Sequence, residues 1–277
     1  MPPGLYIVAT PIGNLRDMTL RAVDVLTQAD LIACEDTRVS GKLLSHFGIS
    51  APTISYNDHN GEQRRPAIFK ALAEGKRVAL VSDAGTPLIS DPGYKLVRDA
   101  IDQGIYVTSI PGASSVMAAL CVAGLPTDRF FFAGFLPARQ EAARSSIREL
   151  RQVPGTLIWF ESARRLTESL FLLHEELGDR PAAVVRELTK LFEEAKRGSL
   201  SELLFHYKSE GEPKGEVVLL VGAPQEAISE QDIEEKLALL LKTHSVKEAA
   251  SIVAEETGSP RKEVYSLALK IMKENDQ

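Results

Sequence analysis

The most informative feature of the chain is a twelve-residue loop, residues 82–93, that directly follows the apolar run 77–81. Two glycines and two prolines in this loop fix special backbone dihedrals, and its small side chains leave main-chain groups free to face a ligand. A second loop of the same kind, residues 111–115, follows the apolar run 105–110 and opens a helix of small residues. Two such loops in succession predict a cofactor crevice.

Length and composition place the chain among ordinary globular proteins. With 277 residues it is near the upper limit for one core, so two domains are expected. Hydrophobic residues make up 44% of the chain and charged residues 25%, as in typical globular domains. No apolar run reaches the ~18 residues that span a bilayer, so we expect no membrane partner and no export.

The cysteines and the net charge bear on the cellular compartment and on nucleic-acid binding. Cys34 and Cys121 form no Cys-x-x-Cys motif and lie in unlike settings, which argues against a disulfide and favours a reduced, cytoplasmic compartment. The net charge of -6 argues against a wholly basic nucleic-acid binder, but it leaves room for a local basic face.

Short apolar runs alternate with helical stretches, which predicts an α/β fold. Strands are expected at 5–9, 30–34, 77–82 and 105–110, and again at 130–134, 156–161, 182–187 and 216–221. Helices are expected at 40–47, 62–74, 94–103 and 114–123, and then at 138–152, 164–177 and 199–209. These patterns predict an N-terminal α/β domain over residues 1–115 and a second α/β domain over residues 116–226.

Residues 227–277 form a charged tail without predicted strands. Ser245 and Glu248 have the spacing of a capping box, and an apolar helical pattern follows them. The breaker 257–260 separates this helix from a last one, as in a helix-turn-helix. The alternative is that both helices merely cap the core.

Several common chemistries lack their motifs. A dinucleotide site needs Gly-x-Gly-x-x-Gly after the first strand, and residues 9–14 do not provide it. No Walker-type phosphate loop is present in the sequence. The five histidines are scattered without metal-ligand spacing, so we expect no metal site.

Six motifs, in order along nearly the whole chain, together resemble the tetrapyrrole methylase superfamily. They are residues 9–15, 29–38, 82–93, 111–115, 186–190 and 215–219. The resemblance is strongest to the branch that methylates ribosomal RNA. It implies two α/β domains with S-adenosylmethionine in the cleft between them, a homodimer, and methylation of a cytidine ribose 2′-oxygen in the decoding region of 16S ribosomal RNA, in the small ribosomal subunit.

Two departures from the wider superfamily favour this RNA branch. Most porphyrin-modifying relatives have Gly-Pro-Gly near the first strand and Gly-Asp-Pro in the main loop, whereas this chain has Pro11-Ile12-Gly13 and Gly85-Thr86-Pro87. The second exchange removes a carboxylate from the loop. Asp83 could substitute for it, or could instead serve as a turn or helix-cap aspartate.

Methyl transfer from a sulfonium needs the methyl carbon, sulfur and acceptor oxygen in line within a dry cleft. Backbone carbonyls of glycine-rich loops can contact the polarised methyl group without offering a competing nucleophile. The candidate cofactor-binding residues are Pro11, Asp83, Ala84, Gly85, Thr86, Pro87, Ala113, Ser114 and Ser115. For the two serines, capping of the following helix is the alternative.

The acceptor side needs a general base or a cation that orients the oxygen, because a ribose hydroxyl is a weak acid. The highest-ranked catalytic candidates lie at strand ends and are Lys190, Glu187, Asp36 and Arg38, with Asp58 and His59 next. For each of them an ion pair or a helix cap is the alternative.

A basic stripe is the candidate RNA contact. Arg144, Arg148 and Arg151 recur at i, i+4 and i+7 and so share one helical face, where they are expected to meet phosphates. A solvated surface balanced by Glu141 and Glu149 is the alternative. The rival functions are a porphyrin or corrin methylase and a non-enzymatic RNA-binding module built on the tail.

Overall fold

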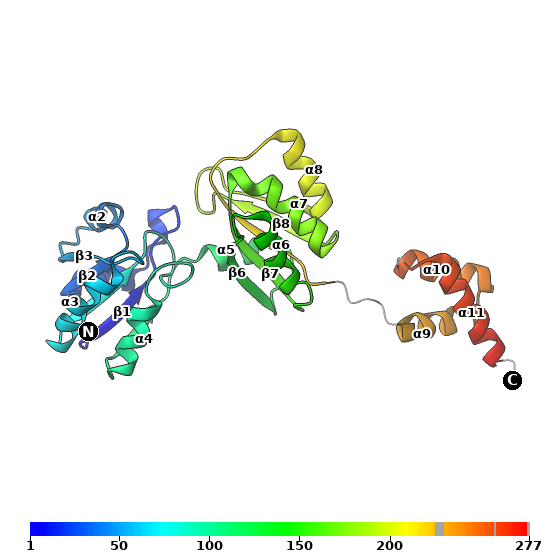
Figure 1. Cartoon of the computed structure of the whole chain (residues 1–277), viewed down its shortest axis with the longest axis horizontal. Helices are drawn as coiled ribbons and strands as arrows, with labels where there is room; N and C mark the ends of the chain where they lie inside the picture. The colour runs from blue at the N-terminus through cyan, green and yellow to red at the C-terminus, as the bar shows by residue number, and fades with distance from the viewer. Residues whose placement is uncertain (225–229, 258, 276–277) are drawn as a thin grey trace. The chain divides into compact units, whose positions relative to one another are not determined.

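The computed structural model describes residues 1–224, 230–257 and 259–275 (Figure 1). The chain forms two compact units, Met1–Pro224 and Gln225–Gln277. The first unit contains two five-stranded sheets, one built from strands of the predicted N-terminal domain and one from strands of the predicted second domain. The predicted α/β fold is confirmed.

The first sheet is parallel throughout, with strand order β3-β2-β4-β1-β5. Its elements in chain order are β1 (Gly4–Val8), the 3-10 turn η1 (Leu15–Asp17), α1 (Leu20–Gln28), β2 (Leu31–Cys34), α2 (Thr37–His46), β3 (Thr53–Ser55), α3 (Gly61–Ala73), β4 (Arg77–Val81), α4 (Tyr94–Asp102) and β5 (Val107–Ile110).

Both faces of this sheet are covered by helices, and alternate residues of each strand serve opposite faces. Tyr6 and Val8 pack toward α1 and α2, whereas Leu5 and Ile7 pack toward α3 and α4. Two-sided burial explains the continuous apolar runs that made these strands predictable. It also leaves the loops at the carboxyl edge as the place where polar groups can gather.

The second sheet is mixed, with strand order β6-β7-β10-β8-β9. Its strands pair antiparallel except for β6 and β7. The elements are α5 (Ser115–Ala123), β6 (Phe130–Phe135), α6 (Gln140–Glu149), β7 (Thr156–Ser162), the 3-10 turn η2 (Ala163–Arg165), α7 (Leu166–Leu177), β8 (Pro181–Arg186), β9 (Glu194–Ser199), α8 (Leu200–Glu210) and β10 (Glu216–Val221).

One face of this second sheet, around the fully buried Trp159, is covered by α6, α7 and α8. The other face packs against α5 and, in the same apolar cluster, against Ile12 from the loop after β1. Ile12 thus joins the first half of the unit to the second sheet.

Among the described residues, two strands and one helix of the first unit had no predicted counterpart, and neither did the helix Glu230–Leu240 of the second unit. Strand β3 is only three residues long, and β9 is a polar edge strand whose sequence lacks an apolar alternation. Helix α1 follows the unusual loop after β1 and buries Ala22, Val25 and Leu26 against the sheet.

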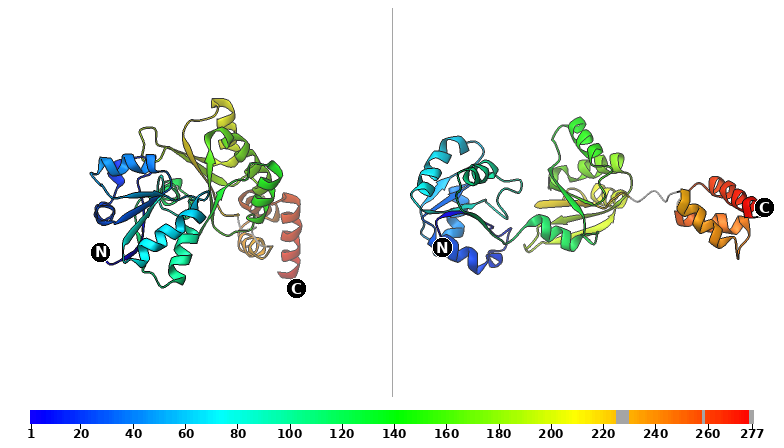
Figure 2. Two further views of the ribbon diagram at one scale, coloured as in Figure 1. Left: turned by 60° about the vertical axis from the view of Figure 1, so that its left-hand side comes forward. Right: turned by 90° about the horizontal axis from the view of Figure 1, so that it is seen from below.

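The C-terminal unit consists, over its described residues, of α9 (Glu230–Leu240), α10 (Val246–Thr257) and α11 (Arg261–Asn275) (Figure 2). Its helices enclose an apolar cluster of their own that includes Leu237, Val253 and Val264. The predicted capping box is confirmed, because the Glu248 amide donates to Ser245 Oγ and the Ser245 amide donates to Glu248 Oε2. Within the described residues, no helix combines the length and apolarity needed to cross a bilayer.

Candidate active site

Three loops follow the neighbouring strands β4, β1 and β5 at the carboxyl edge of the first sheet. The loops after β1 and β4 are joined by a two-way backbone bridge. The Thr10 amide donates to the Gly85 carbonyl at 2.8 Å, and the Gly85 amide donates to the Thr10 carbonyl at 3.1 Å. The third loop is tied to them because Thr86 Oγ1 donates to the Ala113 carbonyl at 3.1 Å.

Gly85 needs the freedom of glycine at this bridge. Its φ is +77°, in the left-handed region that side chains rarely adopt. A Cβ atom there would lie 3.2 Å from Ile12 Cγ2 and 3.9 Å from the Ala113 carbonyl oxygen. The missing side chain therefore lets the three loops pack closely at this point.

A cavity of about 220 Å³ lies between these loops and the second sheet. It is lined by Ile12, Ala84, Ser115, Phe135, Phe160, Glu161, Val185, Glu187, Leu188, Glu216, Val217 and Val218. A smaller cavity of about 70 Å³ shares Ala84, Ser115 and Phe160 with it and also reaches Gly85, Thr86 and Ser114. We call the two cavities together the interdomain cleft.

The main electrostatic feature of this cleft is the ammonium group of Lys190 between two carboxylates. Its Nζ donates to Glu187 Oε1 and to Glu216 Oε2, each at 2.9 Å. Burial alone lowers the pKa of Lys190, but the hydrogen bonds to the Glu216 and Glu187 carboxylates outweigh burial and raise it. Lys190 is therefore an ammonium ion at neutral pH, with one of its three protons not engaged by these carboxylates.

The stem of Lys190 lies against the first half of the unit. A Cβ atom at Gly13 would lie 2.6 Å from Lys190 Cγ, so only glycine permits this approach. The loop after β1 and the loop after β8 therefore meet at the cleft.

Backbone strain gathers in the two loops that flank the cleft. Among the described residues, the non-glycine residues with positive φ are Leu88 and Ser90 in the 82–93 loop, and Glu187 and Thr189 in the loop after β8. Each such conformation costs on the order of 1 to 3 kcal/mol and persists where the surroundings enforce it, often at functional sites. Thr189 Oγ1 is also buried without a hydrogen-bond partner among the described residues.

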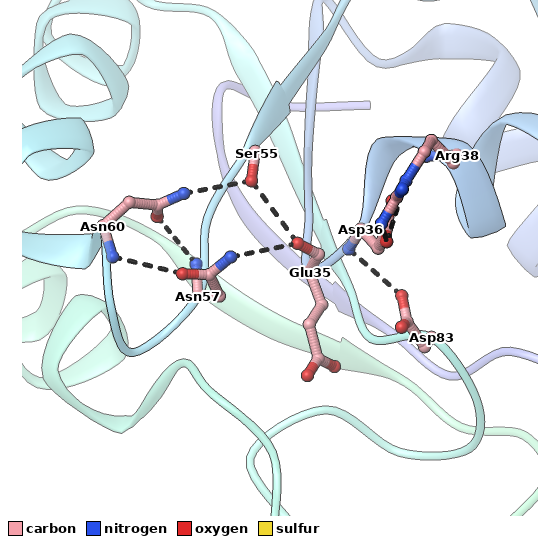
Figure 3. A network of polar contacts seen from close by, with 7 residues as sticks. All are labelled: Glu35, Asp36, Arg38, Ser55, Asn57, Asn60 and Asp83. Carbon is pink, nitrogen blue, oxygen red and sulfur yellow. Dashed lines mark hydrogen bonds and ion pairs between the residues drawn. The ribbon is translucent and has the colours of Figure 1, made fainter.

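Asp36 and Arg38 sit at the start of α2 (Figure 3). Asp36 caps the helix by accepting from the Arg38 amide at 2.8 Å, and it also pairs with the Arg38 guanidinium at 2.6 Å. Hydrogen bonds from Arg38 lower the pKa of Asp36 to about 2. The Arg38 side chain remains 88% exposed, so Asp36 orients a guanidinium that is open to a ligand.

Asp83 lies beside this pair, and its Oδ1 accepts a hydrogen bond from the Asp36 amide at 3.1 Å (Figure 3). This hydrogen bond connects the segments that follow β4 and β2. Nearby, burial raises the pKa of Glu35, and the charges of Asp83 and Asp91 raise it further. Several carboxyl groups are thus crowded at this edge of the sheet.

The predicted cofactor residues divide into two groups. Those that line the cleft are Ala84, Gly85, Thr86, Ser114 and Ser115. Pro11 and Pro87 are buried beside it, Ala113 offers its carbonyl to Thr86, and Asp83 turns toward Asp36. Ser114 also caps α5 by accepting from the Met117 amide at 3.5 Å.

The predicted catalytic residues also fall in two places. Glu187 lines the cleft, and Lys190 is bonded to two of its lining carboxylates. Asp36 and Arg38 form their own pair at the end of β2.

The cleft wall contributed by the second sheet had no predicted counterpart. Phe160, Val185, Val217 and Val218 read in the sequence as ordinary core-strand residues. Glu161 had a usable signal, since it is a carboxylate within an apolar strand. It is buried, and it accepts from Ser169 Oγ at 2.5 Å and from the Ser162 amide at 2.7 Å.

The arginine stripe is engaged by acidic partners. Glu176 on α7 accepts from Arg144 Nη1 at 2.6 Å and from Arg148 Nε at 2.7 Å. The hydrogen bond from Arg148 has the largest effect, and together the two bonds lower the pKa of Glu176 to about 2. Arg151 is exposed, and its carbonyl accepts from the buried Arg180. The stripe therefore carries less free positive charge than the sequence suggests.

The residues of the cleft fit S-adenosylmethionine. Apolar side chains such as Ile12, Leu188 and Val218 exclude water, the bare backbone at Gly85 lets a ligand approach, and carboxylates and a serine hydroxyl supply polar partners. A charged sulfonium that carries a polar amino-acid end and an adenosine with a flat aromatic base matches such a mixed lining.

Comparison with known proteins agrees with this geometry. Residues 4–204 match the family described as Tetrapyrrole (Corrin/Porphyrin) Methylases, and residues 227–272 match the "RsmI C-terminal HTH domain". The second match falls on the part of the chain for which the sequence predicts a helix-turn-helix.

Two relatives carry the name "Ribosomal RNA small subunit methyltransferase I". The one from Mesorhizobium japonicum is 50% identical over 274 residues, covering 98% of this chain and 93% of the relative. The one from Erythrobacter litoralis is 52% identical over 272 residues, covering 98% and 96%.

A solved structure, that of the cobalamin biosynthetic enzyme cobalt precorrin-4 methyltransferase, shares the fold. Its TM-score is 0.56 with 22% sequence identity, and the match covers 79% of this chain and 94% of that one. The chain therefore belongs to the tetrapyrrole (corrin/porphyrin) methylase family and is a methyltransferase that uses S-adenosylmethionine.

Proposed function

We propose that the chain methylates the ribose 2′-oxygen of a cytidine in the decoding region of 16S ribosomal RNA. The observation that carries this proposal is the Lys190 ammonium, held between two carboxylates at the cleft with a proton left to orient an acceptor oxygen. Near-full-length identity to relatives named as small-subunit ribosomal RNA methyltransferases supports RNA as the substrate.

S-adenosylmethionine, when bound, supplies a methyl group on a positively charged sulfur. The residues around it have two tasks, to exclude water and to fix the line between donor and acceptor. Ile12, Leu188 and Val218 exclude water, while Gly85 lines the smaller cavity without a side chain. Ser114 and Ser115 lie where they can bond its amino-acid end.

Lys190 acts as a hydrogen-bond donor rather than as a base, because its neighbours keep it protonated. It points a lone pair of the ribose oxygen toward the methyl carbon. S-adenosylmethionine held in the cleft would supply the methyl group, and its sulfur would keep the electron pair of the broken carbon–sulfur bond as the carbon–oxygen bond formed. The hydroxyl proton then becomes strongly acidic, so a carboxylate of ordinary basicity suffices to accept it.

Glu187 is the proposed acceptor of that proton. Its Oε1 is bonded to Lys190 and to the Glu216 amide, whereas its Oε2 accepts no hydrogen bond from any described residue. The hydrogen bonds from Lys190 and from the Glu216 amide lower the pKa of Glu187, so it is a carboxylate at neutral pH. Asp36 is a positioning residue that aims Arg38 at an RNA phosphate.

We further propose that the protein acts in the cytoplasm as a homodimer on the small ribosomal subunit. Leu191 and Phe192, next to Lys190, are 89% and 68% exposed, and apolar side chains this open favour coverage by a second subunit. The porphyrin or corrin alternative has only the shared fold in its favour. The non-enzymatic alternative is excluded by membership of a methyltransferase family.

Replacing Gly85 by valine should weaken S-adenosylmethionine binding by at least about fivefold, because strain at a left-handed glycine costs on the order of 1 kcal/mol or more. Calorimetric titration with the cofactor and its demethylated product measures this effect. Gly41→Val is the matched control, since a Cβ at Gly41 meets no atom within 4 Å. Normal affinity in a folded Gly85→Val protein would remove this loop from the site.

Lys190→Ala should lower the single-turnover rate of methyl transfer about 10²- to 10⁴-fold, because it removes the group that orients the acceptor. Cofactor affinity, measured alongside, should change little. Lys208→Ala is the control, since Lys208 lies on α8 over the Phe171 ring. Equal losses of rate and cofactor affinity would contradict the assignment of Lys190 to the acceptor.

Two substitutions test whether the arginine stripe binds RNA, one by removing its positive charge and one by freeing that charge. If Arg144, Arg148 and Arg151 meet phosphates, their joint replacement by glutamine should make the slope of log affinity against log salt shallower by roughly 0.7 to 0.9 per lost contact. Glu176→Gln should instead tighten RNA binding, because it releases two arginines from their present partner. An unchanged salt slope in the triple variant would identify the stripe as a solvated surface.

A further inference from the structure

A cavity of about 480 Å³ lies in the first half of the unit, outside the interdomain cleft. Its walls come from the segment after β3 and from the segment that opens α4. The lining residues that matter here are Tyr56, Asp58, His59, Asp91, Tyr94 and Lys95. None of them has a role in the methyl transfer derived above.

This cavity and the interdomain cleft share a wall. Residues 84–86 of the loop after β4 line the cleft, and Asp91 of the same loop lines both the cleft and the 480 Å³ cavity. Within one nucleotide the 2′-oxygen and the base are separated by only a few bonds. A nucleotide whose 2′-oxygen sits in the cleft can thus place its base in an adjoining cavity.

The turn that carries Asp58 and His59 is fixed by its flanking asparagines (Figure 3). Asn57 Oδ1 accepts from the amides of His59 and Asn60, each at 3.1 Å. Asn60 Oδ1 accepts from the Asn57 amide at 2.9 Å, and Asn60 Nδ2 donates to Ser55 Oγ at 3.0 Å. These bonds preorganise the turn before any ligand binds.

The two side chains between these asparagines are left available. Asp58 and His59 are exposed, and neither side chain has a hydrogen bond or an ion pair within the described part of the chain. A rigid turn that presents an unpaired carboxylate and an unpaired imidazole into a cavity is suited to read the edge of a base.

We propose that the 480 Å³ cavity receives the cytosine base of the target nucleotide, with Asp58 accepting from its 4-amino group and His59 donating to its ring edge. This inference rests on the proposed methylation of a cytidine. A carboxylate accepting from N4 is the pairing that distinguishes cytosine from uracil, whose O4 is an acceptor. Tyr94, 67% exposed at the cavity, supplies a ring on which a splayed-out base can stack.

A second cavity next to the cleft, of about 880 Å³, is less suited to a base. Two of its carboxylates are already bonded, Glu161 to Ser169 and Glu216 to Lys190. Arg164 and Lys214 on its walls favour phosphate instead. The free acceptor and donor pair of Asp58 and His59 therefore points to the smaller cavity.

The test uses the full chain, labelled S-adenosylmethionine, and small subunits reconstituted with either cytidine or uridine at the methylated position. The wild type should prefer cytidine. Asp58→Asn should lower the ratio of kcat/KM for cytidine to that for uridine by roughly 10- to 100-fold, because an amide can donate to O4 of uracil. Asp102→Asn removes a carboxylate from the far end of α4 and should leave the ratio unchanged.

Tyr94→Leu removes the stacking ring but keeps the side chains that read the base. It also provides a test if Asp58→Asn fails to fold. Loss of stacking should raise KM several-fold for both RNAs while leaving their ratio unchanged. A wild type without preference, an Asp58→Asn protein with the wild-type ratio, or an unchanged KM in Tyr94→Leu would each overturn the base pocket. Failure of the wild type to methylate either RNA would instead overturn the proposed function, and the pocket with it.

Discussion

The two-way backbone bridge between Thr10 and Gly85 is the constraint on which the rest of the site depends. It holds the loop after β4 against the loop after β1, so that Ile12 reaches the second sheet and Gly85 presents bare backbone to the cleft. The same loop continues to Asp91, which lines the neighbouring cavity as well. One restrained segment thus lines both the cleft and the 480 Å³ cavity.

Electrostatics at the cleft follow from a second contact between the halves. The Lys190 stem lies over Gly13, and its ammonium is held by Glu187 and Glu216. The two carboxylates keep the lysine protonated, which suits orientation of an acceptor and rules out its use as a base at neutral pH. Positive φ at Glu187 and Thr189 shows that the chain tolerates strain to hold this arrangement.

Much of the fold could be predicted because the central strands are buried on both faces. Continuous apolar runs such as 77–81 and 216–221 mark them, and the glycine after several helices marks their ends. The polar edge strand β9 escaped prediction because its residues carry no periodic apolar signal. The glycine-rich composition of the loops after β4 and β5 differs from that of ordinary turns. It therefore made candidates of Gly85, Thr86 and Ser115.

The rest of the site depends on contacts that no local pattern encodes. Glu216 meets Lys190 from a strand 26 residues away, and Glu176 meets the arginine stripe from the next helix. Asp36 has a helix-cap and ion-pair role that its sequence allowed but did not decide. Such pairings require the packed structure, whereas strand and loop chemistry can be read directly from the chain.

We propose that this cleft transfers methyl to one ribose of 16S ribosomal RNA. Mass spectrometry of 16S ribosomal RNA from cells with the gene, without it, and with the Lys190→Ala gene measures this transfer. One 2′-O-methylated cytidine should be lost without the gene and should not be restored by Lys190→Ala. An unchanged set of ribose methylations in cells without the gene, or loss of a base methylation instead, would contradict it.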